Sequence, residues 1–123
     1  MLIHHSLNLK YPIFQGAMAN IATADFAASV ANAGGLGVIA TGSMTPEMVR
    51  EQIHRVRDLT DKPFGVNLML MNPHSEEIVK VICELKPAIV TTGPGNPGKY
   101  VPLLKEAGIK VFPIVPTVAL ARR

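Results

Sequence analysis

The chain has 123 residues, of which 48% are hydrophobic and 5% aromatic, with 12 lysines and arginines against 9 aspartates and glutamates. This length and apolar content suffice for one domain with an aliphatic core. The formal net charge of +3 comes without a dense basic cluster, which argues against a nucleic-acid-binding protein. No apolar run approaches the roughly 20 residues of a membrane-spanning helix, and the amino terminus lacks a signal-peptide core.

The cysteine and histidine residues allow predictions about the cellular compartment and about metal binding. The single cysteine, Cys83, excludes an internal disulfide and favours a reducing compartment, so we predict a cytoplasmic protein. Cys83 lies in a helical pattern, where a buried, unreactive thiol is the simplest interpretation. The four histidines are scattered without metal-ligand spacing, and we predict no metal site.

The first half of the chain alternates short apolar runs with helix-like stretches. A strand is predicted at Tyr11–Gln15, followed by a helix that Thr23 caps and Gly34 ends. The continuous apolar run Leu36–Ala40 is typical of a strand covered on both faces. The next helix begins at Thr45-Pro46 and ends near Thr60. Its predicted buried residues are Met48, Val49, Ile53 and Val56.

The second half repeats this alternation about every 25 residues, the length of one strand and one helix. The predicted elements are a strand at Phe64–Leu70, a helix at Glu76–Leu85, a strand at Ala88–Thr92, a helix at Lys99–Ala107 and a strand at Lys110–Val115. Ile78, Val79, Ile82 and Leu85 are expected to face inward. A last helix begins at Thr117.

This alternation predicts an α/β fold with a parallel sheet, and two architectures fit it. Length alone favours a five-stranded open sheet of flavodoxin type. The first turn, GAMAN, lacks the Gly-rich pattern of a phosphate-binding loop, which argues against that choice. A complete (β/α)8 barrel needs about 250 residues. We therefore predict the N-terminal portion of a TIM-type (β/α)8 barrel, with about five strands and four helices, as a single domain over residues 1–123.

The turns after the predicted strands carry the candidate site, because parallel strands bring their carboxyl ends to one edge. Small residues in PIFQGAMA would let a flat ligand approach the backbone closely, although a tight loop with a core Met18 explains them equally well. Asn67 places an amide inside an apolar strand, where a ligand or a backbone partner would have to satisfy it. The segment TTGPGNP offers hydroxyls and backbone amides for a pocket, and turn chemistry alone also accounts for it.

Together, several segments resemble the N-terminal part of the FMN-dependent enoyl-acyl-carrier-protein reductases, a branch of the nitronate monooxygenase family. The segments are PIFQGAMA, AGGLGVIA, TDKPFGVNLML, TTGPGNP and PIVPTVALARR, in this order, from about Leu7 to the end of the chain. The resemblance implies a TIM-type barrel that binds FMN at the carboxyl ends of its strands, with NADH or NADPH as co-substrate. The substrate would be linked to an acyl carrier protein or be another small molecule.

The resemblance also implies roles for individual residues. Ala17, Met18 and Ala19 would lie against the flavin ring. Asn67 would form a hydrogen bond with the polar edge of the ring, and Gly42 would leave space for the cofactor. The pocket above the ring would be lined by Thr92, Gly93 and Asn96.

The family's catalytic histidine segment, of E-G-x-E-A-G-G-H type, is not found in these 123 residues, and we predict no catalytic residue here. The phosphate-binding loops of the family also follow later strands, so we expect little activity from this chain alone. The alternatives are a nitronate monooxygenase that uses FMN and oxygen, and a non-catalytic half-barrel that self-associates. We expect a homo-oligomer that binds neither nucleic acid nor membrane.

Overall fold

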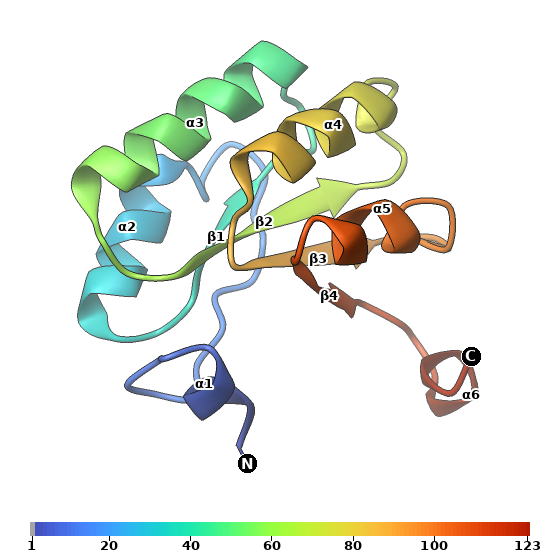
Figure 1. The fold of residues 1–123 in the computed structure, drawn as a ribbon, viewed down its shortest axis with the longest axis horizontal. Helices are drawn as coiled ribbons and strands as arrows, with labels where there is room; N and C mark the ends of the chain where they lie inside the picture. The colour runs from blue at the N-terminus through green and yellow to red at the C-terminus, as the bar shows by residue number, and fades with distance from the viewer. Residues whose placement is uncertain (1) are drawn as a thin grey trace.

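The computed structural model describes residues 2–123 and contains a four-stranded parallel sheet in the order β1-β2-β3-β4 (Figure 1). The strands are β1 (Gly37–Ala40), β2 (Phe64–Met69), β3 (Ile89–Gly93) and β4 (Lys110–Pro113). The helices are α1 (Ile3–Ser6), α2 (Ala24–Ala33), α3 (Pro46–Leu59), α4 (Ser75–Leu85), α5 (Val101–Glu106) and α6 (Val118–Ala121). The predicted alternation of strands and helices is therefore confirmed, apart from the changes described below.

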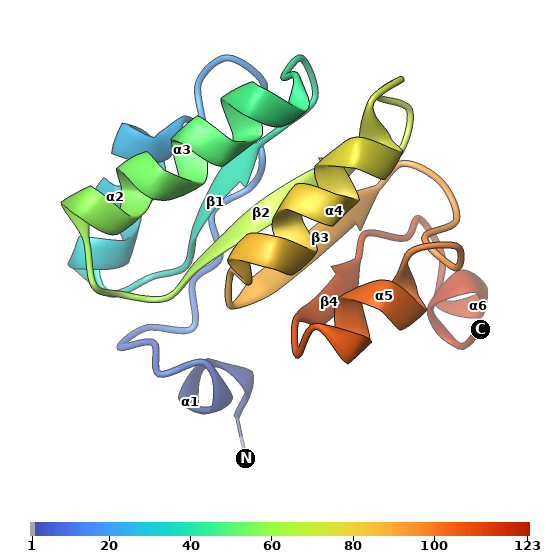
Figure 2. The same ribbon diagram turned by 45° about the horizontal axis from the view of Figure 1, so that its top comes forward.

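The strand order decides between the two predicted architectures. A flavodoxin-type sheet has the order 2-1-3-4-5, in which the winding direction reverses. Here each strand lies beside the next one in the chain, and right-handed crossovers then place every connecting helix on the same face. Figure 2 shows α3, α4 and α5 over one face of the sheet. The open flavodoxin-type alternative is excluded for the described strands, since their order contains no reversal.

The first predicted strand, Tyr11–Gln15, is reduced to one isolated parallel bridge between Phe14 and Leu36. The ladder stops because the side chain of Gln15 takes over the next main-chain partner. Its Oε1 accepts a hydrogen bond from the Val38 N–H at 3.1 Å, and its Nε2 donates to the Val38 carbonyl at 3.0 Å. A side-chain amide thus replaces the peptide groups that would have extended the strand.

Helix boundaries follow the predicted capping residues, although the Thr23 side chain forms no capping hydrogen bond at the start of α2. Gly34 ends α2 in the left-handed conformation, with φ of 104°, and the Thr45 hydroxyl accepts a hydrogen bond from the Met48 N–H at the start of α3. The burial of Met48 was predicted wrongly, because its side chain is 45% exposed. The buried stripe of α3 consists of Val49, Ile53 and Val56, at spacings of four and three residues, and Met48 falls outside it.

The two faces of the sheet are covered differently. The larger hydrophobic core lies between the sheet and helices α2 to α5. A smaller hydrophobic cluster covers the other face of the sheet and contains Leu7, Leu9, Leu36, Val38 and Ile89. On this second face the rings of Phe14 and Phe112 pack edge to face, with centroids 5.8 Å apart. The ammonium group of Lys110 donates to the Ser6 carbonyl at 2.9 Å, which ties the first residues to β4.

Smaller differences concern strand and helix ends. Leu85 is half-buried at the edge of the larger core, α5 begins two residues later than predicted, and β4 ends at Pro113. Gly108 follows α5 in the left-handed conformation, with φ of 79°. Within residues 2–123, no helix combines the length and hydropathy needed to cross a bilayer.

Gly37 in β1 lies directly against the backbone of α2, and this close approach gives a stability prediction. A methyl group added at Gly37 would lie 1.9 Å from the main-chain oxygen of Ala27 in α2. We expect Gly37→Ala to destabilise the fold by about 3 kcal/mol or more, because backbone atoms cannot rotate out of the way. Thermal unfolding should show a lower melting temperature for Gly37→Ala. The control Gly42→Ala places its methyl group 3.4 Å from Met69, an ordinary contact, and should melt at nearly the same temperature as the parent. Equal melting temperatures for the two variants would contradict the close contact between Gly37 and Ala27.

Exposed ion pairs connect successive helices of the outer layer. Arg55 of α3 pairs with Asp25 of α2 at 2.9 Å, and Arg50 of α3 forms a two-bond contact with Glu84 of α4. The hydrogen bonds from Arg50 lower the pKa of Glu84 below its ordinary value of 4.5. Because these groups are solvent-exposed, each pair contributes little to stability.

The lowered pKa of Glu84 gives a pH-dependent prediction. A carboxyl whose pKa is lower in the folded state stabilises the fold above its unfolded pKa, and this contribution is lost as pH falls through the folded pKa. We expect Glu84→Gln to lower the melting temperature slightly at pH 7 and to match the parent once Glu84 is protonated, well below pH 4.5. Melting curves of both proteins across this range would test it, and a difference that grows toward low pH would contradict it.

Candidate functional site

The carboxyl ends of the four strands and the loops that follow them form one edge of the molecule. Neighbouring loops lie side by side along this edge. A methyl group added at Gly42, after β1, would lie 3.4 Å from Cε of Met69 at the end of β2, and one added at Gly95 would lie 3.4 Å from Cδ1 of Leu70. After β4, the Ile114 N–H donates to the Thr92 carbonyl at 2.8 Å. The loops that hold the predicted site residues therefore converge as expected for parallel strands.

Asn67 is the central polar residue of this edge. It lies in β2, is 7% exposed, and its Nδ2 donates to Oγ1 of Thr91 in β3 at 2.9 Å. It shares a face with Gly65, since alternate residues of a strand point the same way. A methyl group at Gly65 would meet the side chain of Ile89, which belongs to the cluster on the face away from the main helix layer. Asn67 therefore lies on this second face.

Thr91 and Thr92 point to opposite faces of β3. Thr91 is opposite Asn67 and contacts its amide, whereas Thr92 is opposite Leu68, a residue of the helix-facing core. Thr92 is 1% exposed, and among residues 2–123 its Oγ1 is the one buried side-chain polar atom without a hydrogen-bond partner. The residue that shares the open face with Asn67 is thus Thr91, whose hydroxyl the sequence analysis named only as part of TTGPGNP, whereas it gave a pocket position to Thr92.

The loop with Ala17, Met18 and Ala19 lies beyond the Phe14 bridge, and all three residues are exposed. Met18 is 38% exposed, so the interpretation of this residue as a core methionine is wrong. Two contacts hold the loop at the edge of β1: the Ala40 N–H donates to the Ala22 carbonyl at 2.9 Å, and the Ser43 hydroxyl contacts Oδ1 of Asn20 at 3.1 Å. The loop therefore reaches the same edge as Gly42.

The loop after β3 begins with Gly93, which precedes a cis peptide bond to Pro94. Asn96 is exposed and its Oδ1 accepts a hydrogen bond from the Gly98 N–H at 2.9 Å, which closes a local turn. Gly95 has a positive φ of 118°, a conformation that favours glycine. The amide of Asn96 is thus engaged within its own loop, while Gly93 lies at the end of the strand.

Two buried polar residues at this edge, Thr41 and Asn72, act as braces, which means that their side chains form hydrogen bonds to the main chain of neighbouring segments. The Thr41 hydroxyl donates to the Asn67 carbonyl at 2.6 Å. The Asn72 Nδ2 donates to the carbonyls of Thr41 and Met44 at 3.0 Å, and its Oδ1 accepts from the His74 N–H at 2.8 Å. Asn72 therefore joins the loop after β1 to the loop after β2. Sequence reasoning missed it, because an asparagine next to a proline is explained by turn preference alone.

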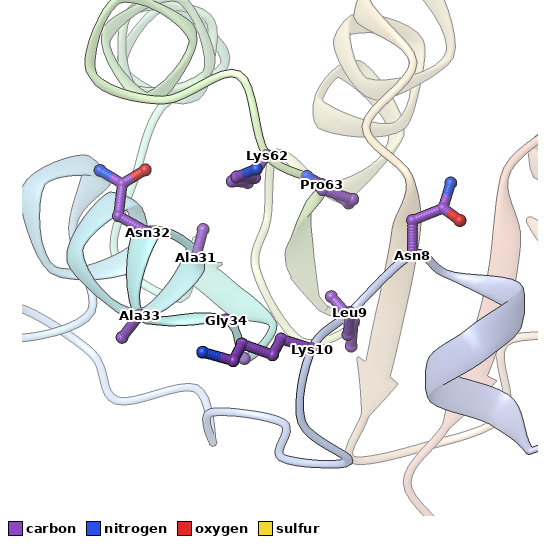
Figure 3. A pocket seen from close by; sticks show the side chains of 10 residues that line it. Asn8, Leu9, Lys10, Ala31, Asn32, Ala33, Gly34, Lys62 and Pro63 are labelled. Carbon is purple, nitrogen blue, oxygen red and sulfur yellow. The ribbon is translucent and has the colours of Figure 1, made fainter.

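A cavity lies at the other end of the strands. Its volume is about 220 Å³, and its walls come from the segment before the Phe14 bridge, the end of α2 and the turn before β2 (Figure 3). Lys10, Asn32 and Lys62 are among the lining side chains, and all three are exposed. Because these segments precede the strands, the cavity lies at the amino edge of the sheet, opposite the predicted site residues.

The predicted site residues can bind and orient a ligand, but they carry no acid or base. Alanine, methionine, glycine, threonine and asparagine do not titrate near neutral pH. Cys83 lies away from this edge, in a groove of α4 and α5, and is half-buried where full burial was predicted. Burial, with a smaller effect of Glu106, raises the pKa of its thiol, which keeps it in the unreactive protonated form.

Comparison with known proteins identifies the family of this chain. The family profile described as nitronate monooxygenase matches residues 2–97. The chain belongs to the nitronate monooxygenase family. It is 42% identical over 85 residues to a probable nitronate monooxygenase of Staphylococcus haemolyticus, an alignment that covers 67% of this chain and 24% of that protein. The match covers the loops that contain Met18 and Gly42 and the strand that contains Asn67.

Solved structures give the same result for the fold. FabK from Thermotoga maritima superposes with a TM-score of 0.95 at 47% sequence identity, over 98% of this chain and 39% of that one. A nitroalkane oxidase from Streptomyces ansochromogenes superposes with a TM-score of 0.87 at 24% identity, which supports the fold alone. This member of the family therefore spans about two fifths of the FabK chain and about a quarter of the curated relative.

The unpartnered hydroxyl of Thr92 leads to a prediction about stability. Replacement by valine keeps the shape of the side chain and removes a buried polar group that has no hydrogen-bond partner within residues 2–123. We expect Thr92→Val to stabilise the fold by about 1 kcal/mol, because the desolvation cost of the hydroxyl disappears. Urea unfolding of both proteins would measure the difference. Destabilisation by a similar amount would show that the hydroxyl has a partner in solution.

Proposed function

We propose that this chain forms the ring-binding part of an FMN-dependent oxidoreductase with a TIM-type barrel. The whole protein would reduce the double bond of a 2-enoyl-acyl-carrier-protein with NADH or NADPH, as part of fatty-acid synthesis. The observation that carries the proposal is Asn67, a nearly buried amide in β2 whose Oδ1 accepts no hydrogen bond from residues 2–123. It lies at the carboxyl edge, where barrels bind their ligands.

The chemistry of this edge fits a flavin ring. A flat heteroaromatic ring needs apolar surface for its faces and a few polar groups for its edge. Met18 and two alanines offer uncharged surface on an exposed loop, Gly42 adds no side chain, and Asn67 offers an acceptor. These residues would hold the ring, while the phosphate would need cationic or loop groups other than the predicted site residues. Bound FMN supplies hydride transfer between the nicotinamide and the substrate double bond.

The choice of the reductase rests on the relatives. The 47% identity to FabK over nearly the whole chain agrees with the resemblance of the sequence to the enoyl-acyl-carrier-protein reductases, and together they support this reaction. The second candidate, oxidation of alkyl nitronates with FMN and oxygen, is favoured by the family profile and by the Staphylococcus haemolyticus relative. Both reactions use the same ring-binding edge.

Gly42 gives a test of the proposed cofactor site. A methyl group here meets only Met69 at an ordinary 3.4 Å, so Gly42→Ala should fold normally. If Gly42 leaves room for the ring, the added methyl should weaken FMN binding about tenfold or more, measured by quenching of flavin fluorescence. Ser29→Ala, on the exposed surface of α2, serves as a control that should bind like the parent. No saturable FMN binding by the parent, or equal binding by Gly42→Ala, would contradict the proposed site.

The two reactions are separated by assays on the complete protein. Oxidation of NADH or NADPH in the presence of a 2-enoyl thioester under anaerobic conditions would support the reductase. Oxygen consumption with an alkyl nitronate, and no thioester reduction, would support the monooxygenase. Self-association and cytoplasmic location stay predictions.

A further inference from the structure

The inference concerns Thr91, and it rests on the proposed flavin site. Thr91 and Asn67 are opposite one another in the β2–β3 ladder, on the face away from the main helix layer. Neighbouring strands hold this pair together, so the contact between the two side chains does not depend on a flexible loop. A strand position is also well suited to orient a group precisely.

The hydrogen bonds of Asn67 define which end of its amide faces β3. Nδ2 lies 2.9 Å from Oγ1 of Thr91 and 3.5 Å from the Thr91 main-chain carbonyl. A main-chain carbonyl can only accept a hydrogen bond, whereas a hydroxyl can donate or accept. An amide turned the other way would place two acceptor oxygens near each other. The NH2 group is therefore the end that faces Thr91.

The opposite end of the amide is then free. In residues 2–123 no donor reaches Oδ1 of Asn67, and the one buried polar side-chain atom without a partner is on Thr92. Oδ1 is consequently accessible from the surface although the residue as a whole is 7% exposed. Such an oxygen accepts hydrogen bonds and cannot donate them, so it selects a ligand edge that carries N–H or O–H.

We propose that Thr91 is a positioning residue that turns the Asn67 amide so that its carbonyl oxygen, Oδ1, faces the ligand. The site then prefers a ring that presents an N–H group to β2, as the polar edge of a flavin does. Thr91 touches no reacting atom in this role. It acts through Asn67, by occupying the NH2 group.

The test compares Thr91→Val, which keeps the shape of threonine, with Thr91→Ser, which keeps the hydroxyl. In the ligand-free protein labelled with ¹⁵N, the side-chain amide signals of Asn67, assigned by their loss in Asn67→Leu, report its hydrogen bonds. We expect Thr91→Val to shift these signals and Thr91→Ser to leave them near their original positions. FMN titration should show binding about five- to tenfold weaker for Thr91→Val and nearly unchanged for Thr91→Ser, as for one lost hydrogen bond.

The two readouts separate this inference from the proposed function. Unchanged Asn67 signals in Thr91→Val would overturn the positioning role whether or not FMN binds. Shifted signals with unchanged FMN affinity would also overturn it, because the amide would then not face the ring. If the parent binds no FMN, the proposed function fails, and shifted signals in Thr91→Val that Thr91→Ser restores would still support the orientation of Asn67 by Thr91.

Discussion

The parallel register between β2 and β3 determines which polar groups meet at the candidate site. In this register Asn67 lies opposite Thr91, and Leu68 lies opposite Thr92. A slip of one residue would turn Asn67 into the helix-facing core, where an unpaired amide costs about 1–3 kcal/mol. Val66 and Leu68, which flank Asn67 and have no exposed surface, hold the register. The position of the amide is therefore a product of hydrophobic packing on the other face.

The sequence predicts most of the elements because their signals are local. Thr45 before Pro46 and Gly34 after α2 act within one helical turn, so their effects can be read without tertiary information. The shortened first strand could not be predicted, since it depends on a contact between Gln15 and Val38, 23 residues apart. At the site, Asn67 stands out as an amide in an apolar run. The hydroxyls of Thr91 and Thr92 are both visible in TTGPGNP, but which of them shares a face with Asn67 depends on the register between β2 and β3.

The braces beneath the site affect how a ligand would bind. Asn72 satisfies two carbonyls and one N–H of two different loops, and Thr41 adds a bond to the main chain of Asn67. Loops that are already fixed lose little freedom when a ligand arrives, so less of the interaction energy is spent on ordering them. Because the predicted site residues are not acids or bases, orientation is their main contribution, and proton transfer would have to come from groups outside this set.

The edge-to-face contact between Phe14 and Phe112 also reveals the shape of the sheet. Adjacent strands are about 4.8 Å apart, so in a flat sheet the Phe14 bridge and β4 would be separated by four spacings, about 19 Å. Their ring centroids are 5.8 Å apart. Two side chains cannot bridge that difference across a flat surface. The sheet must therefore curve strongly around this face, with its concave side toward Phe14 and Phe112, as the wall of a closed cylinder does.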